Sequence, residues 1–242
     1  MAILKSHIPL YREIIAIPGV VSERMLTFGY QDLMGEDLPA DFAFADLKPI
    51  LLAQGAGSVT TLDYFDKRAD LAYDMNLPVP AEEHEKYTTL LDIGCLEHLF
   101  DTRQCIENCL RMVRVGGIYM LHTCVKGYFE HGLHAFNPEG LLQALELNSF
   151  EILYLRYTTD AGKVIKSPAY GENVVIWVVA KKRVPLTAFV MPQQSLWRDY
   201  TLERHTKKKR RTGVKGLLHA VLAGGWRRLL SLRNDVRQLL DD

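Results

Sequence analysis

Long apolar runs and paired cysteines are both missing from this chain of 242 residues. No apolar run approaches the ~20 residues that a membrane-spanning helix needs, so we do not expect an integral membrane protein. The four cysteines form no Cys-x-x-Cys pair, and the sequence opens on no recognisable signal peptide. These observations predict a cytoplasmic protein with reduced, buried thiols, and they argue against a framework of disulfides.

An excess of charge of one sign is also missing. Lysine and arginine together number 29, as do aspartate and glutamate, so the formal net charge is zero. The distribution is uneven, because the run Lys207–Arg211 and several later arginines make the C-terminal region basic. A single basic run without aromatic stacking positions does not make a nucleic-acid surface. We therefore expect no nucleic-acid partner.

Composition and pattern predict one soluble α/β domain with an appendage. Apolar residues make up 48% of the chain and charged residues 24%, which is typical of soluble globular proteins. We expect an amphipathic start over 1–20, strands at 24–28, 58–62, 87–92, 118–122, 150–157 and 173–180, a short extended segment within 71–80, and helices at 47–54 and 138–149. The alternation predicts parallel strands followed by an antiparallel pair.

One segment, 87–123, carries the most specific pattern. Its first strand is followed by a loop with Glu97 and His98, then by a helix, a Gly-Gly turn and a second buried strand. Glycine permits the φ values that such a turn requires. In open α/β sheets, ligands bind in the crevice beyond the carboxyl ends of the strands. The loop with Glu97 and His98 is therefore a candidate for a functional site.

The order strand, Glu-His, amphipathic helix, Val-Gly-Gly, strand resembles the second half of the class I methyltransferases that depend on S-adenosylmethionine (SAM). At the end of the first strand, where that family usually carries a Gly-x-Gly loop, this chain reads Gly29-Tyr-Gln-Asp32. This turn is similar to that of a branch with a degenerate first glycine motif, found among polysaccharide and natural-product gene clusters. The resemblance covers roughly residues 22–182.

The resemblance implies a Rossmann-like α/β fold. We expect a doubly wound, seven-stranded sheet with an antiparallel C-terminal hairpin, followed by an amphipathic helical tail. The chain would then divide into an N-terminal helical segment at 1–21, a methyltransferase-like domain at 22–183 and a basic amphipathic extension at 184–242.

The resemblance also implies SAM as the cofactor. A glycine at position 29 lets the backbone approach the methionine part, the carboxylate of Asp63 accepts from ribose hydroxyls, and Asp74 meets the adenine amine. The expected cofactor-binding residues are Gly29, Gln31, Asp63, Asp74, Met75, Leu96 and Glu97. The alternatives are an ordinary strand-to-loop turn at Gly29 and an exposed loop carboxylate at Asp63.

Histidines and aromatic residues crowd the segment 122–138. A neutral imidazole titrates near the working pH, so a histidine can take the proton of a methyl acceptor. The candidate bases are His131, His98 and His134. We expect no metal, because most class I enzymes of this type need none, although His131 and His134 with His122 or Glu130 could ligate one. A lid loop whose histidines bond only to backbone is the alternative.

The functional expectation is methyl transfer from SAM to a small polar acceptor, with an oxygen of a sugar or secondary metabolite as the first choice. The reaction would be an in-line displacement at the sulfonium methyl, with the protein supplying proximity and orientation. The alternative is a catalytically silent methyltransferase-like scaffold in a biosynthetic complex. The tail favours a homo-oligomer or a partner protein, and after these a peripheral membrane contact.

Overall fold

The computed structural model describes residues 2–193. The expected helical tail and the run Lys207–Arg211 lie outside these residues. The main sheet contains, in spatial order, β4 (Ser58–Leu62), β2 (Arg24–Phe28), β5 (Tyr87–Ile93), β6 (Val113–Lys126), β9 (Val174–Lys182), β7 (Phe150–Thr159) and β8 (Val164–Ile165). The α-helices are α1 (Ile8–Ile15), α2 (Leu47–Ala53), α3 (Thr102–Met112) and α4 (Pro138–Leu147).

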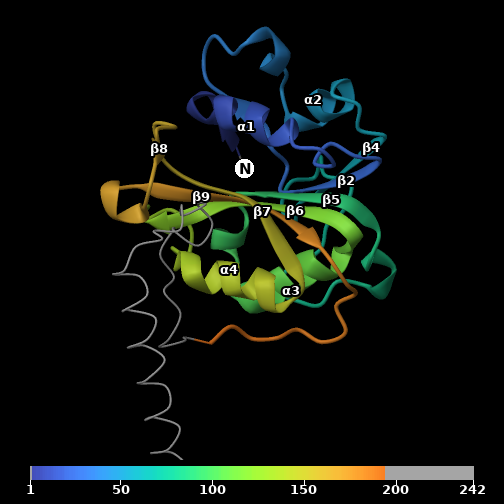
Figure 1. The fold of residues 1–242 in the computed structure, drawn as a ribbon. Coiled ribbons are helices and arrows are strands. Elements are labelled where there is room, and N and C mark those ends of the chain that lie inside the picture. Colours follow the sequence, from blue (N-terminus) through green and yellow to red (C-terminus); the bar gives the residue numbers. More distant parts are fainter. Residues whose placement is uncertain (1, 194–242) are drawn as a thin grey trace, which may run out of the picture. The chain divides into compact units, whose positions relative to one another are not determined.

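The fold has three layers. Helices α1 and α2 cover one face of the sheet, and α3 and α4 cover the other (Figure 1). Strands β4, β2, β5 and β6 are parallel, and β9 runs antiparallel to both of its neighbours, β6 and β7. The predicted α/β class, the seven strands and the antiparallel pair at the end of the domain are thus confirmed.

The seventh strand is not the extended segment expected within 71–80. That segment contributes only a single parallel bridge, between Leu71 and Leu62. The two-residue strand β8 completes the sheet instead, by pairing antiparallel with the end of β7.

The Gly116-Gly117 pair lies inside β6 and not in a separate tight turn. Tyr87 of β5 pairs with Val113, but Thr89 pairs with Ile118, so β6 carries a bulge between these two positions. Gly116 has a φ of +80° there. The predicted turn is therefore an irregularity within one long strand.

Local signals explain where the two long helices begin. The side chain of Asp101 accepts from the backbone N–H of Gln104 at 2.9 Å and caps α3. Asn137 caps α4 by accepting from the N–H of Glu139 at 2.9 Å, and Pro138 follows at the first helical position. All seven residues of β5 are buried, as expected for a parallel strand covered on both faces.

The N-terminal segment packs into the same core as the sheet. Leu10 and Ile14 of α1 join a buried cluster that includes Met120 of β6 and Trp177 of β9. Just before α1, β1 (Ala2–Leu4) pairs in parallel with β3 (Asp32–Met34) in a small second sheet. Short 3-10 turns are found at Lys5–His7, Ala40–Phe42, Ala81–Glu83, Leu96–His98 and Pro168–Tyr170.

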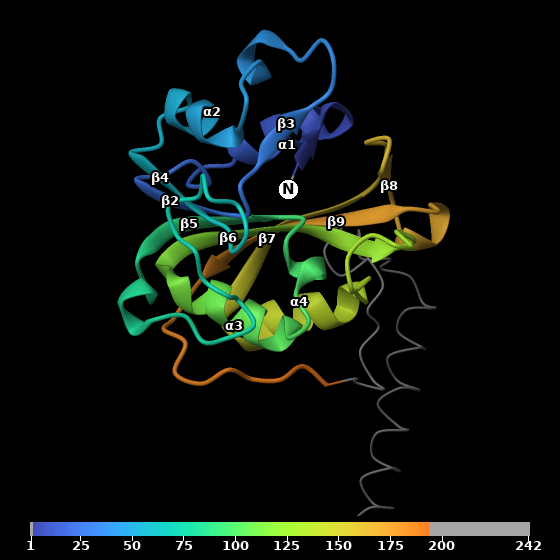
Figure 2. The same cartoon turned by 180° about the vertical axis from the view of Figure 1, so that it is seen from behind.

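The chain beyond β9 returns along the α3 and α4 side of the sheet (Figure 2). Asn148, at the end of α4, donates to the carbonyl oxygen of Val190 at 3.0 Å and accepts from its N–H at 2.8 Å. The first residues of the expected extension therefore pack on the domain. None of the described helices has the length and apolar character needed to cross a membrane.

Candidate functional site

A cavity of about 350 Å³ opens at the carboxyl ends of β2, β4 and β5. This is the edge at which open α/β sheets bind ligands, and the volume is in the range of small-molecule sites. The cavity is lined by Phe28, Gly29, Asp63, Tyr64, Phe65, Tyr73, Asp74, Met75, Asn76, Cys95, His98, Leu99, Phe100 and Leu133. It thus brings together five of the residues singled out in the sequence: Gly29, Asp63, Asp74, Met75 and His98.

Gly29 follows β2 directly and forms part of the cavity wall. Its φ is +83°, a conformation that glycine adopts without the strain other residues would suffer. Its N–H donates to the carbonyl oxygen of Leu62 at 2.7 Å, which ties the ends of β2 and β4 together. A ligand at this position would meet backbone and no side chain.

Asp63 follows β4 and organises the loop after it. One carboxylate oxygen accepts from the N–H of Tyr30 at 3.0 Å, and the other accepts from the N–H groups of Phe65 and Asp66 at 2.9 and 3.0 Å. Burial raises the pKa of Asp63, but these amide hydrogen bonds outweigh it and bring the pKa below its ordinary value. An ionised carboxylate offers about four acceptor positions, so three amides leave room for a ligand hydroxyl.

Asp74 presents a carboxylate with one oxygen committed. Its Oδ1 accepts from the backbone N–H of Asn76 at 2.9 Å and from the Asn76 side-chain amide at 2.8 Å. Among the described residues, none donates to Oδ2. The segment from Asp74 to Asn76 is fixed in place by Asn76 Oδ1, which accepts from the N–H of Asp101 at the start of α3.

Asn108 of α3 holds the segment that follows this turn. Its side-chain amide donates to the carbonyl oxygens of Leu77 at 2.8 Å and Met75 at 3.2 Å, and its Oδ1 accepts from the N–H of Val79 at 3.2 Å. Asn108 is 1% exposed. A helix on one face of the sheet therefore fixes a wall of the cavity.

Aromatic side chains at the cavity were not anticipated from the sequence. Tyr64 and Phe65 follow Asp63 directly, and their rings meet edge to face at 4.8 Å. Phe65 is 87% exposed and Phe100 is 81% exposed. Large exposed apolar side chains around a cavity are typical of ligand sites. Two adjacent aromatic residues at a strand end were the signal available in the sequence.

Gln31 and Leu96 do not line the cavity. The Gln31 amide donates to the carbonyl oxygens of Phe28 at 2.9 Å and Ile93 at 3.1 Å, so it joins the ends of β2 and β5. The thiol of Cys95 donates to the same Phe28 carbonyl at 2.9 Å. Leu96 is fully buried. Gln31 thus supports the strand ends that carry the cavity, and Leu96 lies in the protein interior.

Glu97 connects the loop after β5 to the histidine-rich loop after β6. The residue is 4% exposed, and its carboxylate accepts from the hydroxyl of Thr123 at 2.7 Å. Its carbonyl oxygen accepts from the N–H groups of Leu133 at 2.7 Å and His134 at 3.2 Å. A Cβ at Gly132 would lie 3.0 Å from that oxygen. Burial raises the pKa of Glu97.

The structure brings together only part of the predicted histidine cluster. The rings of His98 and His131 lie 5.1 Å apart, and burial, followed by the nearby His131, lowers the pKa of His98. His134 instead lies beside Phe136, at 5.8 Å between ring centroids. His122 is buried and stacks on Trp177 at 4.0 Å, and burial lowers its pKa well below the ordinary value.

No protein-family model matches this chain, and no curated protein sequence matches it. Solved structures do match. A SAM-dependent methyltransferase from Mesorhizobium loti superposes with a TM-score of 0.50 and 15% identity, over 73% of this chain and 98% of that chain. The 1,6-didemethyltoxoflavin-N1-methyltransferase from Burkholderia thailandensis, solved with 1,6-didemethyltoxoflavin and S-adenosylhomocysteine, gives 0.48 and 14%, over 73% and 77%. The [4+2]-cyclase SpnF gives 0.47 and 17%, over 73% and 79%. The Mesorhizobium match shows that this chain has a methyltransferase-type fold.

Proposed function

We propose that the chain binds SAM in the cavity at the ends of β2, β4 and β5 and transfers the methyl group to a small polar acceptor, with an oxygen nucleophile as the first choice. The observation that carries the proposal is the convergence on one cavity of Gly29, from the loop after β2, with Asp63 and Asp74, from the long connection between β4 and β5. The fold shared with a SAM-dependent methyltransferase supports it.

The groups around the cavity fit the parts of SAM. Backbone at Gly29 accommodates the methionine part, and the remaining acceptor position of Asp63 suits a ribose hydroxyl. Oδ2 of Asp74 suits the adenine amine, with the exposed ring of Phe65 available for stacking. When bound, SAM supplies an electrophilic methyl group. The protein would hold and orient the acceptor and take its proton, and His98 is the candidate base that lines the cavity.

A calorimetric titration of the full chain with SAM tests the proposal, and Asp74→Asn is the sharpest variant. Asparagine keeps the Oδ1 acceptor that Asn76 uses but replaces the other oxygen with a donor, which cannot pair with the adenine amine. We expect a loss of about 1–3 kcal/mol in binding, which is roughly a 5- to 150-fold rise in Kd. Asp63→Ala should lose affinity to a similar extent.

Asp66→Ala is the matched control, because Asp66 lies in the same loop but does not line the cavity. Its SAM affinity should equal that of the unaltered chain. If the Asp74→Asn and Asp63→Ala variants bind SAM as tightly as the unaltered chain, these two residues do not belong to the site. A full-length chain with no measurable SAM binding would favour the silent scaffold instead.

Single substitutions separate the three candidate bases. Loss of the true base should lower turnover by about two to four orders of magnitude, with SAM affinity nearly unchanged. Turnover is measured as release of S-adenosylhomocysteine with a panel of hydroxylated sugars and metabolites. The cavity position of His98 makes His98→Ala the first variant to test, followed by His131→Ala and His134→Ala. Normal turnover in all three variants would exclude His98, His131 and His134 as the base.

A further inference from the structure

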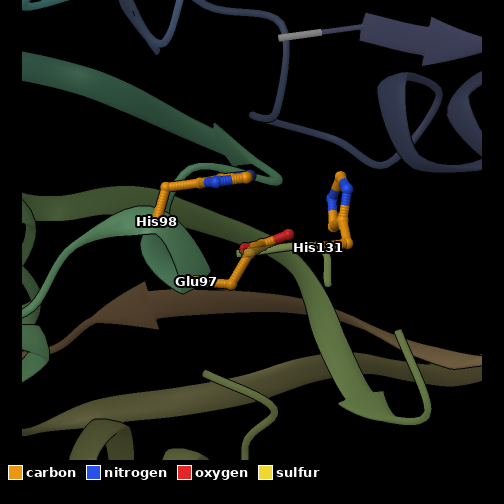
Figure 3. Close-up of side chains that lie close together, drawn as sticks. All are labelled: Glu97, His98 and His131. Atoms are coloured by element: carbon orange, nitrogen blue, oxygen red, sulfur yellow. The ribbon is translucent and has the colours of Figure 1, made fainter. Parts of the chain in front are cut away.

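The side chains of Glu97, His98 and His131 converge on one small space. Each offers one ligand atom, and these three atoms lie within 4.8 Å of one another. Figure 3 shows the two imidazoles and the carboxylate directed at this space from the loop after β5 and the loop after β6. This set differs from the one suggested by the spacing of histidines in the sequence.

The ligand atoms are available. Within residues 2–193, neither imidazole makes a side-chain hydrogen bond, and Glu97 uses only Oε2, which accepts from Thr123 at 2.7 Å. That bond fixes the carboxylate, as an outer-shell partner does for a metal ligand. The loop that carries His131 is held against Glu97 by the two backbone hydrogen bonds to the Glu97 carbonyl oxygen.

We propose that Glu97, His98 and His131 bind a divalent transition-metal ion, with Zn²⁺ as the expected occupant. Two imidazoles and one carboxylate form a ligand set of catalytic zinc sites, which keep a further position open. Imidazole suits zinc and its neighbours in the transition series, whereas Mg²⁺ prefers an all-oxygen shell. His98 also lines the cavity, so the ion would lie at the edge of the space proposed for SAM.

Metal binding requires the three ligand atoms to move only slightly closer together. Metal–ligand bonds of about 2.0–2.2 Å place the ligand atoms of a tetrahedral site about 3.3–3.6 Å apart, somewhat closer than they lie here. Both histidines are exposed, so their side chains have room to rotate toward the Glu97 carboxylate. Glu97, the buried ligand, can stay in place.

The metal site and the role of His98 or His131 as a free base are alternatives, because a bound ion uses the lone pairs that a base needs. Metal binding can be measured without SAM, so its failure leaves the proposed methyltransferase function standing. Loss of SAM binding likewise leaves the metal site standing.

The experiment is a titration of the untagged, chelator-treated full chain with Co²⁺, followed by visible absorption, with Zn²⁺ as competitor. We expect one ion per chain, displaced by Zn²⁺ and not by Mg²⁺. Glu97→Gln keeps the shape and the bond to Thr123, and His131→Ala changes an exposed residue, so both should fold. Each should weaken binding by more than the roughly 10- to 100-fold expected for Thr123→Val, which removes only an outer-shell partner.

His134→Ala and His84→Ala serve as matched controls, because both remove an imidazole outside the set. Their Co²⁺ affinity should equal that of the unaltered chain, with folding checked by thermal unfolding. The proposal is overturned if the chain binds no stoichiometric Co²⁺ or Zn²⁺. It is equally overturned if Glu97→Gln, His98→Ala and His131→Ala all bind the ion as tightly as the controls.

Discussion

Asp92 is a carboxyl group with no exposed surface at the end of β5. Tyr119 donates its hydroxyl to Oδ2 at 3.0 Å, and the N–H of Cys95 donates to Oδ1 at 3.2 Å. Burial, and after it the charge of Glu97, raises the pKa of Asp92 to about 7 despite these bonds. At neutral pH the carboxyl group is therefore close to its titration midpoint.

This pKa predicts a pH dependence of stability. The unfolded chain loses the Asp92 proton near its ordinary pKa of about 3.9, whereas the folded chain keeps it to about pH 7. Between these values the folded state binds more protons, so stability falls as pH rises, and above pH 7 the full penalty applies. Asp92→Asn removes the charge. Its free energy of unfolding, relative to the unaltered chain, should rise from pH 5 to pH 8 in denaturant titrations. A difference independent of pH would contradict this prediction.

The placement of single residues was predictable where it depended on strand ends. Asp63 and Gly29 reach one cavity because the carboxyl ends of the parallel strands β4 and β2 meet at one edge, which a sequence pattern can reveal. Asp74 reaches it from further along the connection between β4 and β5. The sequence could not show that the Gln31 amide turns toward the carbonyls of Phe28 and Ile93. Nor could it pair His131 with Glu97, because that contact depends on how two loops dock.

At the scale of elements, α3 controls the segment after Asp74 through one side chain, Asn108. Asn108→Leu would leave the carbonyls of Met75 and Leu77 and the N–H of Val79 without their partner. Each buried unsatisfied group costs about 1–3 kcal/mol. We expect a clear loss of unfolding free energy in denaturant titrations, together with weaker SAM binding by calorimetry.

Gln104→Ala is the control on the same helix, because Gln104 donates to Asn108 and makes no hydrogen bond to the 75–79 segment. Gln104→Ala should change the unfolding free energy and the SAM affinity much less than Asn108→Leu does. If Asn108→Leu lowers stability but leaves SAM affinity intact, the segment does not take part in binding.

Elements with local signals were predictable, and those with distant partners were not. The start of α4 follows from Asn137 and Pro138, which lie in the helix itself or next to it. By contrast, β1 is defined only by its pairing with β3, some thirty positions along the chain. The bulge at Gly116 likewise arises from a register shift against β5, which composition does not encode.

At the scale of the whole molecule, the described residues, 2–193, belong to one compact unit. The sequence of the later residues is basic and amphipathic, which predicts burial of an apolar face against a second copy or a partner. A chain shortened to residue 206 should keep its SAM affinity and show a lower oligomeric state by light scattering. Unchanged mass and unchanged association with anionic vesicles would contradict this role, and loss of SAM binding would assign the tail to the site.

The position of β9 between β6 and β7 also has a consequence in time. Each of these strands pairs along one edge with β9, yet β9 is the last of the three to leave the ribosome. At synthesis rates of about 5–20 residues per second, the edge of β6 that pairs with β9 stays unpaired for several seconds. Open edges invite pairing with other chains. A nascent chain halted between Thr159 and Val174 would therefore be at its most vulnerable to aggregation, and the arrival of Val174–Lys182 would end that interval.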